Sequence, residues 1–414
     1  MSNTTLTADV IAKIALPILD NELGFLKRMH RGHEAEWSSN VNGYKKGDTI
    51  SIRRPADFTV RSGAAMSTQD VIEGKTALTI DQQKGVDFQF TSTDLTLNVE
   101  DMAERILKPA MINLANAIGE DVLAQMYKGT YNAVGTPGQT VNSFSDYILV
   151  PQRMAEMTVP MQDRTSVLSP TDYYGLVGSQ TSLFSPGLVG SAYREGELGQ
   201  LAGIETMMSQ VTPTHTVGVA TGTPLVNGAS QTVTYDAAKN TWTQTLETDG
   251  WTNSTAGILK AGDVFTIADV YMVNAKTKAT TGILQQFVVM SDADSGATTG
   301  PATLTISPPM ITSGPHQTVN AAAADNAAIT VLGTGGTAYR QNLAFHKGAM
   351  SMAFVPMEMP QAAYGGTRKS HKDISIRLIP TYDAANDISK WRMDVLYGRK
   401  LTDPRLSLRF YGVA

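Results

Sequence analysis

The stretch GILKAGDVFTIADVYMVN, residues 257–274, alternates apolar and polar side chains and therefore predicts a β-strand. It lies in a long segment, 213–336, that is rich in Thr, Ala, Gly and Val. Other short alternating runs separated by turn residues surround it: QTVTYD, TWTQTL, LQQFVVMSD and ATLTISPPM. This spacing is typical of a small β-barrel or sandwich. The flanking sequence carries helical patterns, long loops and most of the charge, so we predict an all-β unit inserted into an α+β chain.

Before the insertion, apolar residues between Thr7 and His30 recur at helical spacing, and Pro17 predicts a break or kink. Two alternating strands follow, KKGDTISIRRP and GVDFQFTST, separated by a polar stretch at 56–84. They predict a long two-stranded arm with little core. The clearest helix is 98–129, which would run about 45 Å, with Asn98 as cap, Pro109 as a bend and Gly129 as a stop signal.

After this helix we expect a short helix at 146–157, the strand SVLSP and a Gly- and Ser-rich loop at 175–190. Beyond the insertion, DISIRLIPTYD, KWRMDVLYG and LSLRFYGV predict strands. Residues 140–212 and 338–414 would then be two halves of one domain that the β unit interrupts.

Composition limits the function classes. The 414 residues suffice for several domains, while the net charge of -5 and the 17% of charged residues do not indicate nucleic acid as a specific partner. The chain has no Cys, so neither disulfides nor thiolate chemistry are expected. Neither a secretion signal nor a membrane-spanning run is evident, and we expect a soluble protein made in the cytoplasm.

The motifs that bear on chemistry are weak. His30, His33 and Glu36 in HRGHEAE lack the usual metal-site spacing, and a solvated polar turn is favoured. In SDADSG, Asp292 and Asp294 lack the distal Glu of a calcium loop, so a β-turn is favoured. The Met-rich run at 348–360 is either a promiscuous binding surface or, more commonly, flexible core packing. We therefore predict no catalytic, cofactor-binding or metal-binding residues.

The order of elements carries a family resemblance. A leading tail, a long hairpin with a strut helix, the inserted module with LKAGDVFTI, and the closing WRMDVLYGRKLTDPRLSL together resemble the major capsid (coat) protein of P22-type tailed bacteriophages, which has the HK97 fold. Tyr397, Gly398 and Pro404 match the closing strand and turn of that family. The resemblance implies an icosahedral shell that encloses double-stranded DNA, located in the virion and made in the host cytoplasm.

The resemblance also names the parts. It implies an N-arm at 1–40, an E-loop with flanking peripheral-domain strands at 41–93, a spine helix at 94–130, peripheral and axial domains at 131–212 and 338–414, and an insertion domain at 213–337. The partners implied are further copies in hexamers and pentamers, a scaffolding protein, a portal and non-specifically bound DNA, with no membrane.

Three groups of residues are candidates for contacts. The E-loop is too poor in apolar residues to fold on its own core, so we expect it to lie across an adjacent subunit. The candidate E-loop charges are Arg53, Arg54, Asp57, Arg61, Lys75 and Lys84. In the N-arm, the stripe of Ile14, Ile18 and Leu23 would either clamp a neighbour or pack on its own subunit. In the insertion domain, Asp236, Lys239 and Asn240 form an expected hairpin tip, which is short for a loop that reaches another capsomer.

Two alternatives to a phage coat remain. An encapsulin-like nanocompartment would share the fold, although the inserted β module favours the phage branch. A hydrolase with a carbohydrate-binding β module would need paired acidic residues in a cleft and aromatic platforms, for which Trp242 and Trp251 are the aromatic candidates.

Overall fold

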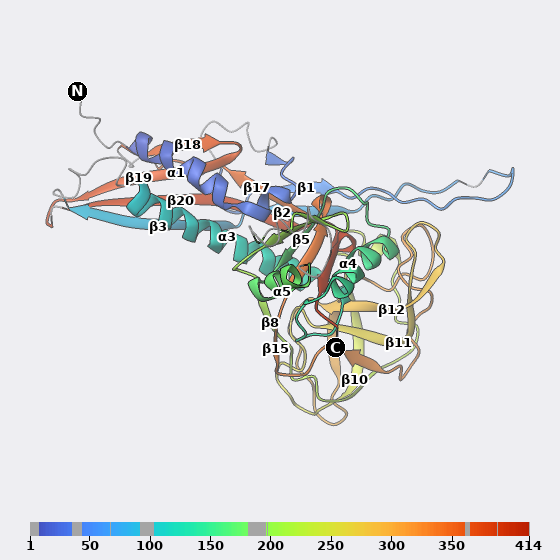
Figure 1. Ribbon diagram of the computed structural model, residues 1–414. Coiled ribbons are helices and arrows are strands. Elements are labelled where there is room, and N and C mark those ends of the chain that lie inside the picture. Colours follow the sequence, from blue (N-terminus) through green and yellow to red (C-terminus); the bar gives the residue numbers. More distant parts are fainter. Residues whose placement is uncertain are drawn as a thin grey trace. The chain divides into compact units, whose positions relative to one another are not determined.

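The computed structural model describes residues 8–34, 44–66, 68–91, 103–180, 196, 198–360, 365–386 and 388–413 (Figure 1). The chain divides into two compact units, and each unit is assembled from three separate segments. The first unit comprises Met1–Ser51, Ala77–Val122 and Met350–Lys400. The second comprises Ile52–Thr76, Leu123–Ala349 and Leu401–Ala414. Helices and sheets occur in the two units, so the α+β prediction is confirmed.

The first unit contains a five-stranded sheet covered by helices. Its strands are β17 (Met350–Val355), β20 (Ile388–Leu401), β19 (Ile374–Asp383), β18 (Thr367–His371) and β3 (Gln82–Thr91), which pairs with β20. Helix α1 (Ala8–Glu22) packs on β18 and β19, and a 3₁₀ turn, η1 (Gly24–Arg28), follows it (Figure 1). The buried side chains of α1 include Ile11, Leu16 and Leu19. Helix α1 continues through Pro17, so of the predicted break or kink at this residue the break is wrong.

The helix predicted at 98–129 differs from the prediction at its beginning. A π-helical segment, η4 (Ala103–Leu107), precedes the regular helix α3 (Lys108–Gly129), and Asn98 lies outside the described residues. Pro109 is the second residue of α3, which follows directly after the π-helical segment, and its missing N–H interrupts the regular hydrogen-bond pattern there. Gly129 is the last helical residue, against which Leu401 packs closely.

The second unit contains a six-stranded mixed sheet, whose strands come from the sequence on both sides of the inserted module. In order across the sheet, its strands are β4 (Ala133–Val134), β21 (Ser407–Phe410), β16 (Asn342–His346), β5 (Arg164–Leu168), β7 (Ile204–Met208) and β6 (Gln200–Leu201). Helices α4 (Phe144–Glu156) and α5 (Pro170–Gln180) share a hydrophobic core with this sheet. The loop expected at 175–190 is therefore wrong up to Gln180, because α5 extends to that residue.

The inserted module is a nearly closed β-barrel. Its strand order is β14 (Ile329–Val331), β11 (Val264–Val273), β12 (Thr280–Val289), β13 (Ala302–Ser307), β10 (Gln244–Trp251) and β9 (Gly222–Val226). The edge strands approach each other, since Leu225 bridges Ala328 and the Val226 amide donates to the Ala327 carbonyl at 3.0 Å. Within the quoted stretch, Val264–Val273 form strand β11, and the residues before it are not in a strand. QTVTYD is not a strand, because its end begins the one-turn helix α7 (Tyr235–Ala238), capped by Thr234.

Two features join the module to the rest of its unit. Its entry and exit form a two-stranded ribbon of β8 (Thr214–Thr216) and β15 (Ala338–Arg340). The Gln286 side chain on β12 both accepts from the Ala133 amide at 2.7 Å and donates to the Ala133 carbonyl at 2.9 Å, so it substitutes for a backbone strand partner of β4. The 3₁₀ turns η5 (Lys347–Ala349) and η6 (Pro404–Leu406) complete the described helices of this unit.

The arm is a hairpin, but it pairs different strands from those predicted. Strand β1 (Thr49–Arg53) pairs with β2 (Lys75–Thr79), and the long loop 54–74 between them forms the free part of the arm. The second predicted arm strand, GVDFQFTST, belongs to β3 and pairs with β20 in the sheet of the first unit. Strand alternation alone does not identify a partner, and that is why the pairing was predicted wrongly.

Candidate assembly site

The free part of the arm, 54–74, has few internal ties. Near its base, Arg53 forms an ion pair with Glu73 at 3.2 Å, and both side chains are exposed. Further out, Gln69 bridges the two chains of the loop. Its Oε1 accepts from the Thr59 amide at 2.9 Å and from the Thr59 hydroxyl at 2.8 Å, and its Nε2 donates to the Thr59 carbonyl at 2.7 Å. This amide holds the outer arm together where no strand ladder is described.

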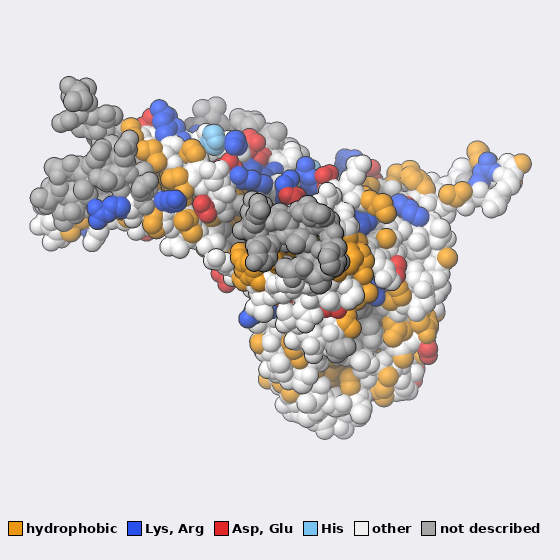
Figure 2. Space-filling view, viewed as in Figure 1, with side chains coloured by type: hydrophobic (Ala, Val, Ile, Leu, Met, Phe, Trp, Pro, Cys, Tyr) orange, Lys and Arg blue, Asp and Glu red, His pale blue; other side chains and the backbone are white. Residues whose placement is uncertain are grey.

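The outer arm exposes large apolar side chains. Val60 and Met66 are 96% and 84% exposed, and Phe58 and Val71 are also exposed. Hydrophobic side chains are visible along the projecting arm in Figure 2. These four exposed residues of the loop 54–74 are called the apolar patch of the arm, and exposed apolar patches mark contact surfaces.

The base of the arm is built around Trp242. The guanidinium groups of Arg54 and Arg405 lie over its indole ring at 5.8 Å and 5.5 Å from the centroid. Arg54 is buried, and its Nε donates to the Thr402 carbonyl at 3.1 Å. Arg405 is held by Asp403 through a bidentate pair, with Nε to Oδ1 at 2.9 Å and Nη2 to Oδ2 at 2.7 Å. The cation–π contacts fix the outgoing chain of the arm at Arg54.

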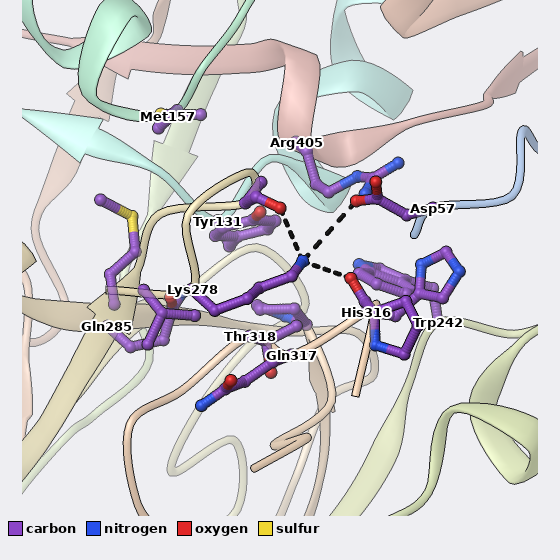
Figure 3. A pocket seen from close by; sticks show the side chains of 15 residues that line it. Asp57, Tyr131, Met157, Trp242, Lys278, Gln285, His316, Gln317, Thr318 and Arg405 are labelled. Carbon is purple, nitrogen blue, oxygen red and sulfur yellow. Dashed lines mark hydrogen bonds and ion pairs between the residues drawn. The ribbon is translucent and has the colours of Figure 1, made fainter. Parts of the chain in front are cut away.

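A second contact at the base is the ion pair between Asp57 and Lys278 (Figure 3). The two charged atoms lie 3.7 Å apart, and both side chains are mostly buried. Lys276 approaches the same carboxylate at 3.5 Å but is 70% exposed. Burial opposes ionisation of Asp57, but Lys278 and Lys276 outweigh it, so the pKa of this carboxyl is lowered. Burial is the main reason why the pKa of Lys278 is also lowered.

His316 lies beside this ion pair. Asp57, Lys278 and His316 all line one small cavity of about 50 Å³. Its ring stacks on Tyr235 with centroids 3.6 Å apart. Burial, helped by the nearby charge of Arg405, lowers the pKa of His316 to about 4. The imidazole is therefore neutral at pH 7 and acts as a packing surface.

The returning chain of the arm contacts α7 and the residues after it. The Lys75 amide donates to Asn240 Oδ1 at 3.0 Å. A Cβ at Gly74 would lie 2.3 Å from the Lys239 carbonyl oxygen, so this close approach requires glycine. Asp236 and Lys239 pair with each other at 2.7 Å. The three residues predicted as a hairpin tip are thus on and after a one-turn helix at the base of the arm.

The remaining predicted contact residues are dispersed. The Arg61 guanidinium donates to the nearby Gly63 carbonyl. Lys84 is not on the arm, since it lies on β3 and its Nζ donates to the Ala117 carbonyl on α3 at 2.8 Å. In the N-terminal stripe, Leu23 is buried in its own subunit, whereas Ile14 and Ile18 are half-buried.

The weak motifs have structural roles. Asp292 and Asp294 accept from the amides of Ala261 and Gly257 at 2.8 and 2.6 Å, as loop carboxylates do, so both have a structural partner. Glu36 of the histidine motif lies outside the described residues. Met350 and Met352 are fully buried in β17, which confirms core packing. No group of three potential metal ligands occurs in the part of the chain that the structure describes.

The hydrolase alternative loses its aromatic candidates. Trp242 and Trp251 are 4% and 2% exposed, so neither is a platform for a sugar ring.

Among the helices of the described ranges, none is sufficiently long and apolar to cross a membrane.

A family model described as P22 coat protein, gene protein 5, matches residues 8–412. The chain belongs to the P22 coat protein family. This coat protein is a structural capsid protein that assembles with copies of itself into the shell of a phage virion, and the interpretation of the sequence as a P22-type major capsid protein is confirmed. The encapsulin and hydrolase alternatives are not favoured.

Solved structures with similarity to this coat protein come from several phages. One from Mycobacterium phage Che8 is 14% identical, with a TM-score of 0.46, and the match covers 93% of this chain and 90% of that chain. One from Gordonia phage Cozz is 10% identical, with a TM-score of 0.40 and coverage of 93% and 87%. The CUS-3 coat protein I-domain is 29% identical over 27% of this chain and 96% of its own length, with a TM-score of 0.19. A search of curated proteins found no match.

Proposed function

We propose that the free part of the arm is the E-loop of this coat protein and that its apolar patch binds a neighbouring copy in the shell. The observation that carries this proposal is the joint exposure of Phe58, Val60, Met66 and Val71 on a loop that is held by few internal ties. Burying each of these side chains contributes about 1 kcal/mol or more. Repeated around a closed shell, contacts of this modest size give a durable assembly.

The arm charges have a divided role in this proposal. Arg53 and Arg61 are solvent-exposed and would face the neighbour, where exposed pairs contribute about 0 to 1 kcal/mol each. Arg54 and Asp57 instead hold the arm to its own subunit. In the N-arm, the half-buried Ile14 and Ile18 remain available to a neighbour or to a scaffolding protein.

The proposal extends to partners and parts. The segments 1–40, 41–93, 94–130, 131–212, 213–337 and 338–414 would serve as N-arm, E-loop region, spine helix, first peripheral and axial part, insertion domain and second axial and peripheral part. A scaffolding protein and a portal would complete assembly. The net charge of -5 favours weak, non-specific contact with packaged double-stranded DNA.

A triple variant of the arm tests this role. Phe58→Ser with Val60→Ser and Met66→Ser should leave the stability of the unassembled subunit within about 0.5 kcal/mol of the original, because these side chains are exposed. It should weaken subunit association by about 100-fold, as expected for about 3 kcal/mol of lost burial. Sedimentation and electron microscopy measure the yield of closed shells.

A matched control is Met161→Ser, which removes a side chain that is 77% exposed and lies outside the arm. It should assemble normally. Closed shells of the triple variant in normal yield would show that the arm patch binds no neighbour.

A further inference from the structure

Both chains of the arm are held at the base by one and the same element, the inserted module. On the outgoing chain, Arg54 lies over Trp242 and Asp57 pairs with Lys278. On the returning chain, the Lys75 amide donates to Asn240. Gly74 also packs on the Lys239 carbonyl. These contacts come from separate parts of the module, so they resist rotation of the arm about its base in more than one direction.

The Lys278 ammonium group is a fixed point in this arrangement. Besides Asp57, it donates to the Ala275 carbonyl at 2.6 Å and to the Pro315 carbonyl, and Figure 3 shows it at the centre of these acceptors. Its side chain is 15% exposed. A cation that the module's own backbone holds in place orients its partner carboxylate more firmly than a solvated lysine does.

The geometry points to a positioning role for the module: we infer that the inserted β module of each subunit sets the direction of that subunit's own arm, with Lys278 and Asp57 as the central contact. The inference deepens the proposed function of the arm and rests on it for its biological meaning. It assigns the module a task inside its own subunit, ahead of any contact with another capsomer.

Small rotations at the base have large effects at the end of the arm. The chain from Asp57 to Met66 spans up to about 30 Å when it is extended. A rotation of about 10° at the base therefore moves the end by about 5 Å, which is enough to misplace an apolar contact. Holding the arm in its binding direction before association lowers the entropy cost of docking.

The absence of Cys permits a direct measurement on the full chain. Met66→Cys on the arm and Ala297→Cys on the module, both exposed positions, each take one nitroxide label. Pulsed electron paramagnetic resonance then gives the distance distribution between arm and module in the unassembled subunit. We expect a narrow distribution in the parent and a distribution at least twice as wide in Lys278→Met.

Two matched variants make the result specific. Lys276→Met removes the exposed lysine from the same carboxylate and should leave the distribution narrow, because an exposed pair restrains little. Lys278→Arg keeps the charge and should restore much of the narrow distribution. Hydrogen exchange in β11 and β12 should be unchanged in all three, which shows that the module remains folded.

If Lys278→Met prevents folding, Asn240→Ala removes the hydrogen bond to the returning chain and should still widen the distribution. An unchanged distribution in a folded Lys278→Met subunit, or equal widening in Lys276→Met, would overturn the inference. Assembly yield reports separately on the proposed function. A widened distribution with normal shells would leave the positioning role intact and contradict the contact role of the arm.

Discussion

The arm and the inserted module belong to the same compact unit but are stabilised in opposite ways. The module surrounds a continuous core in which Phe265, Phe287 and Leu304 are fully buried. The arm turns Val60 and Met66 outward and depends on side-chain ties at its base and at Gln69. A chain in which one segment forms a self-sufficient barrel can contain another segment that has no core of its own. Under the proposed function, stability of the subunit and association with neighbouring copies are assigned to different segments.

The largest expected effect tests the self-sufficiency of the module. Phe287→Ala removes a fully buried ring that packs on Phe265 with centroids 5.8 Å apart. We expect a loss of about 3 to 5 kcal/mol in the free energy of unfolding, since a cavity remains in a packed core. Urea unfolding of the unassembled chain measures this. Val60→Ala on the arm is the control and should change stability by less than about 0.5 kcal/mol. Equal small effects of the two substitutions would remove the contrast between the regions.

The next effect concerns the junction of the two regions and its response to pH. The folded-state pKa of His316 is lowered to about 4 by burial and by Arg405 and Lys278, against partial compensation from Asp57 and Asp403. The unfolded chain therefore binds the proton more tightly, and stability is lost as pH falls from about 6.5 to about 4. The loss from this group is up to about 3 kcal/mol.

His316→Phe keeps a ring that can stack on Tyr235 but cannot be protonated. Its stability should vary less than that of the parent between pH 6.5 and pH 4.5, as measured by urea midpoints at several pH values. Asp57 acts in the same direction at lower pH, since its lowered pKa means that the stabilising charge is lost only when the pH falls through that value. Parallel pH profiles of variant and parent would show that His316 does not contribute.

The smallest effect sharpens the description of the arm. Gln69→Ala removes three hydrogen bonds to Thr59 and should speed exchange of the Thr59 amide by about fivefold, equivalent to about 1 kcal/mol of local opening. Gln69→Glu keeps the acceptor and loses the donor, so its exchange should be intermediate. Global stability should not change in either. Unaltered exchange at Thr59 in Gln69→Ala would mean that the outer arm is held by other contacts.

The sequence predicted those elements whose signal is local. The strand at 373–383 was placed within one residue of β19, and part of the stretch 257–274 forms β11, because apolar residues recur along both segments in a strand-like pattern. QTVTYD shows the limit of the same signal, since a short alternating run ending at a Thr cap leads into a helical turn.

The candidate site was beyond the reach of local signals. Asp57 and Lys276 are separated by 219 positions, so no spacing pattern links them. Arg53 and Arg54 are adjacent, and strand geometry predicts that they point to opposite sides. Only the fold reveals that Arg54 is the one covered by Trp242. The apolar side chains Phe58, Val60, Met66 and Val71 were also missed, because the arm was interpreted as polar and its charges were taken as the contact residues.

The ribbon of β8 and β15 brings the entry and exit of the inserted module side by side, with Tyr339 opposite His215. Paired residues of an antiparallel ribbon lie about 5 Å apart, so the points at which the module begins and ends are only a short distance apart. The ribbon is therefore a suitable grafting point, at which a foreign domain whose ends are equally close could replace the barrel in every subunit. The foreign domain would also have to provide new contacts that hold the base of the arm.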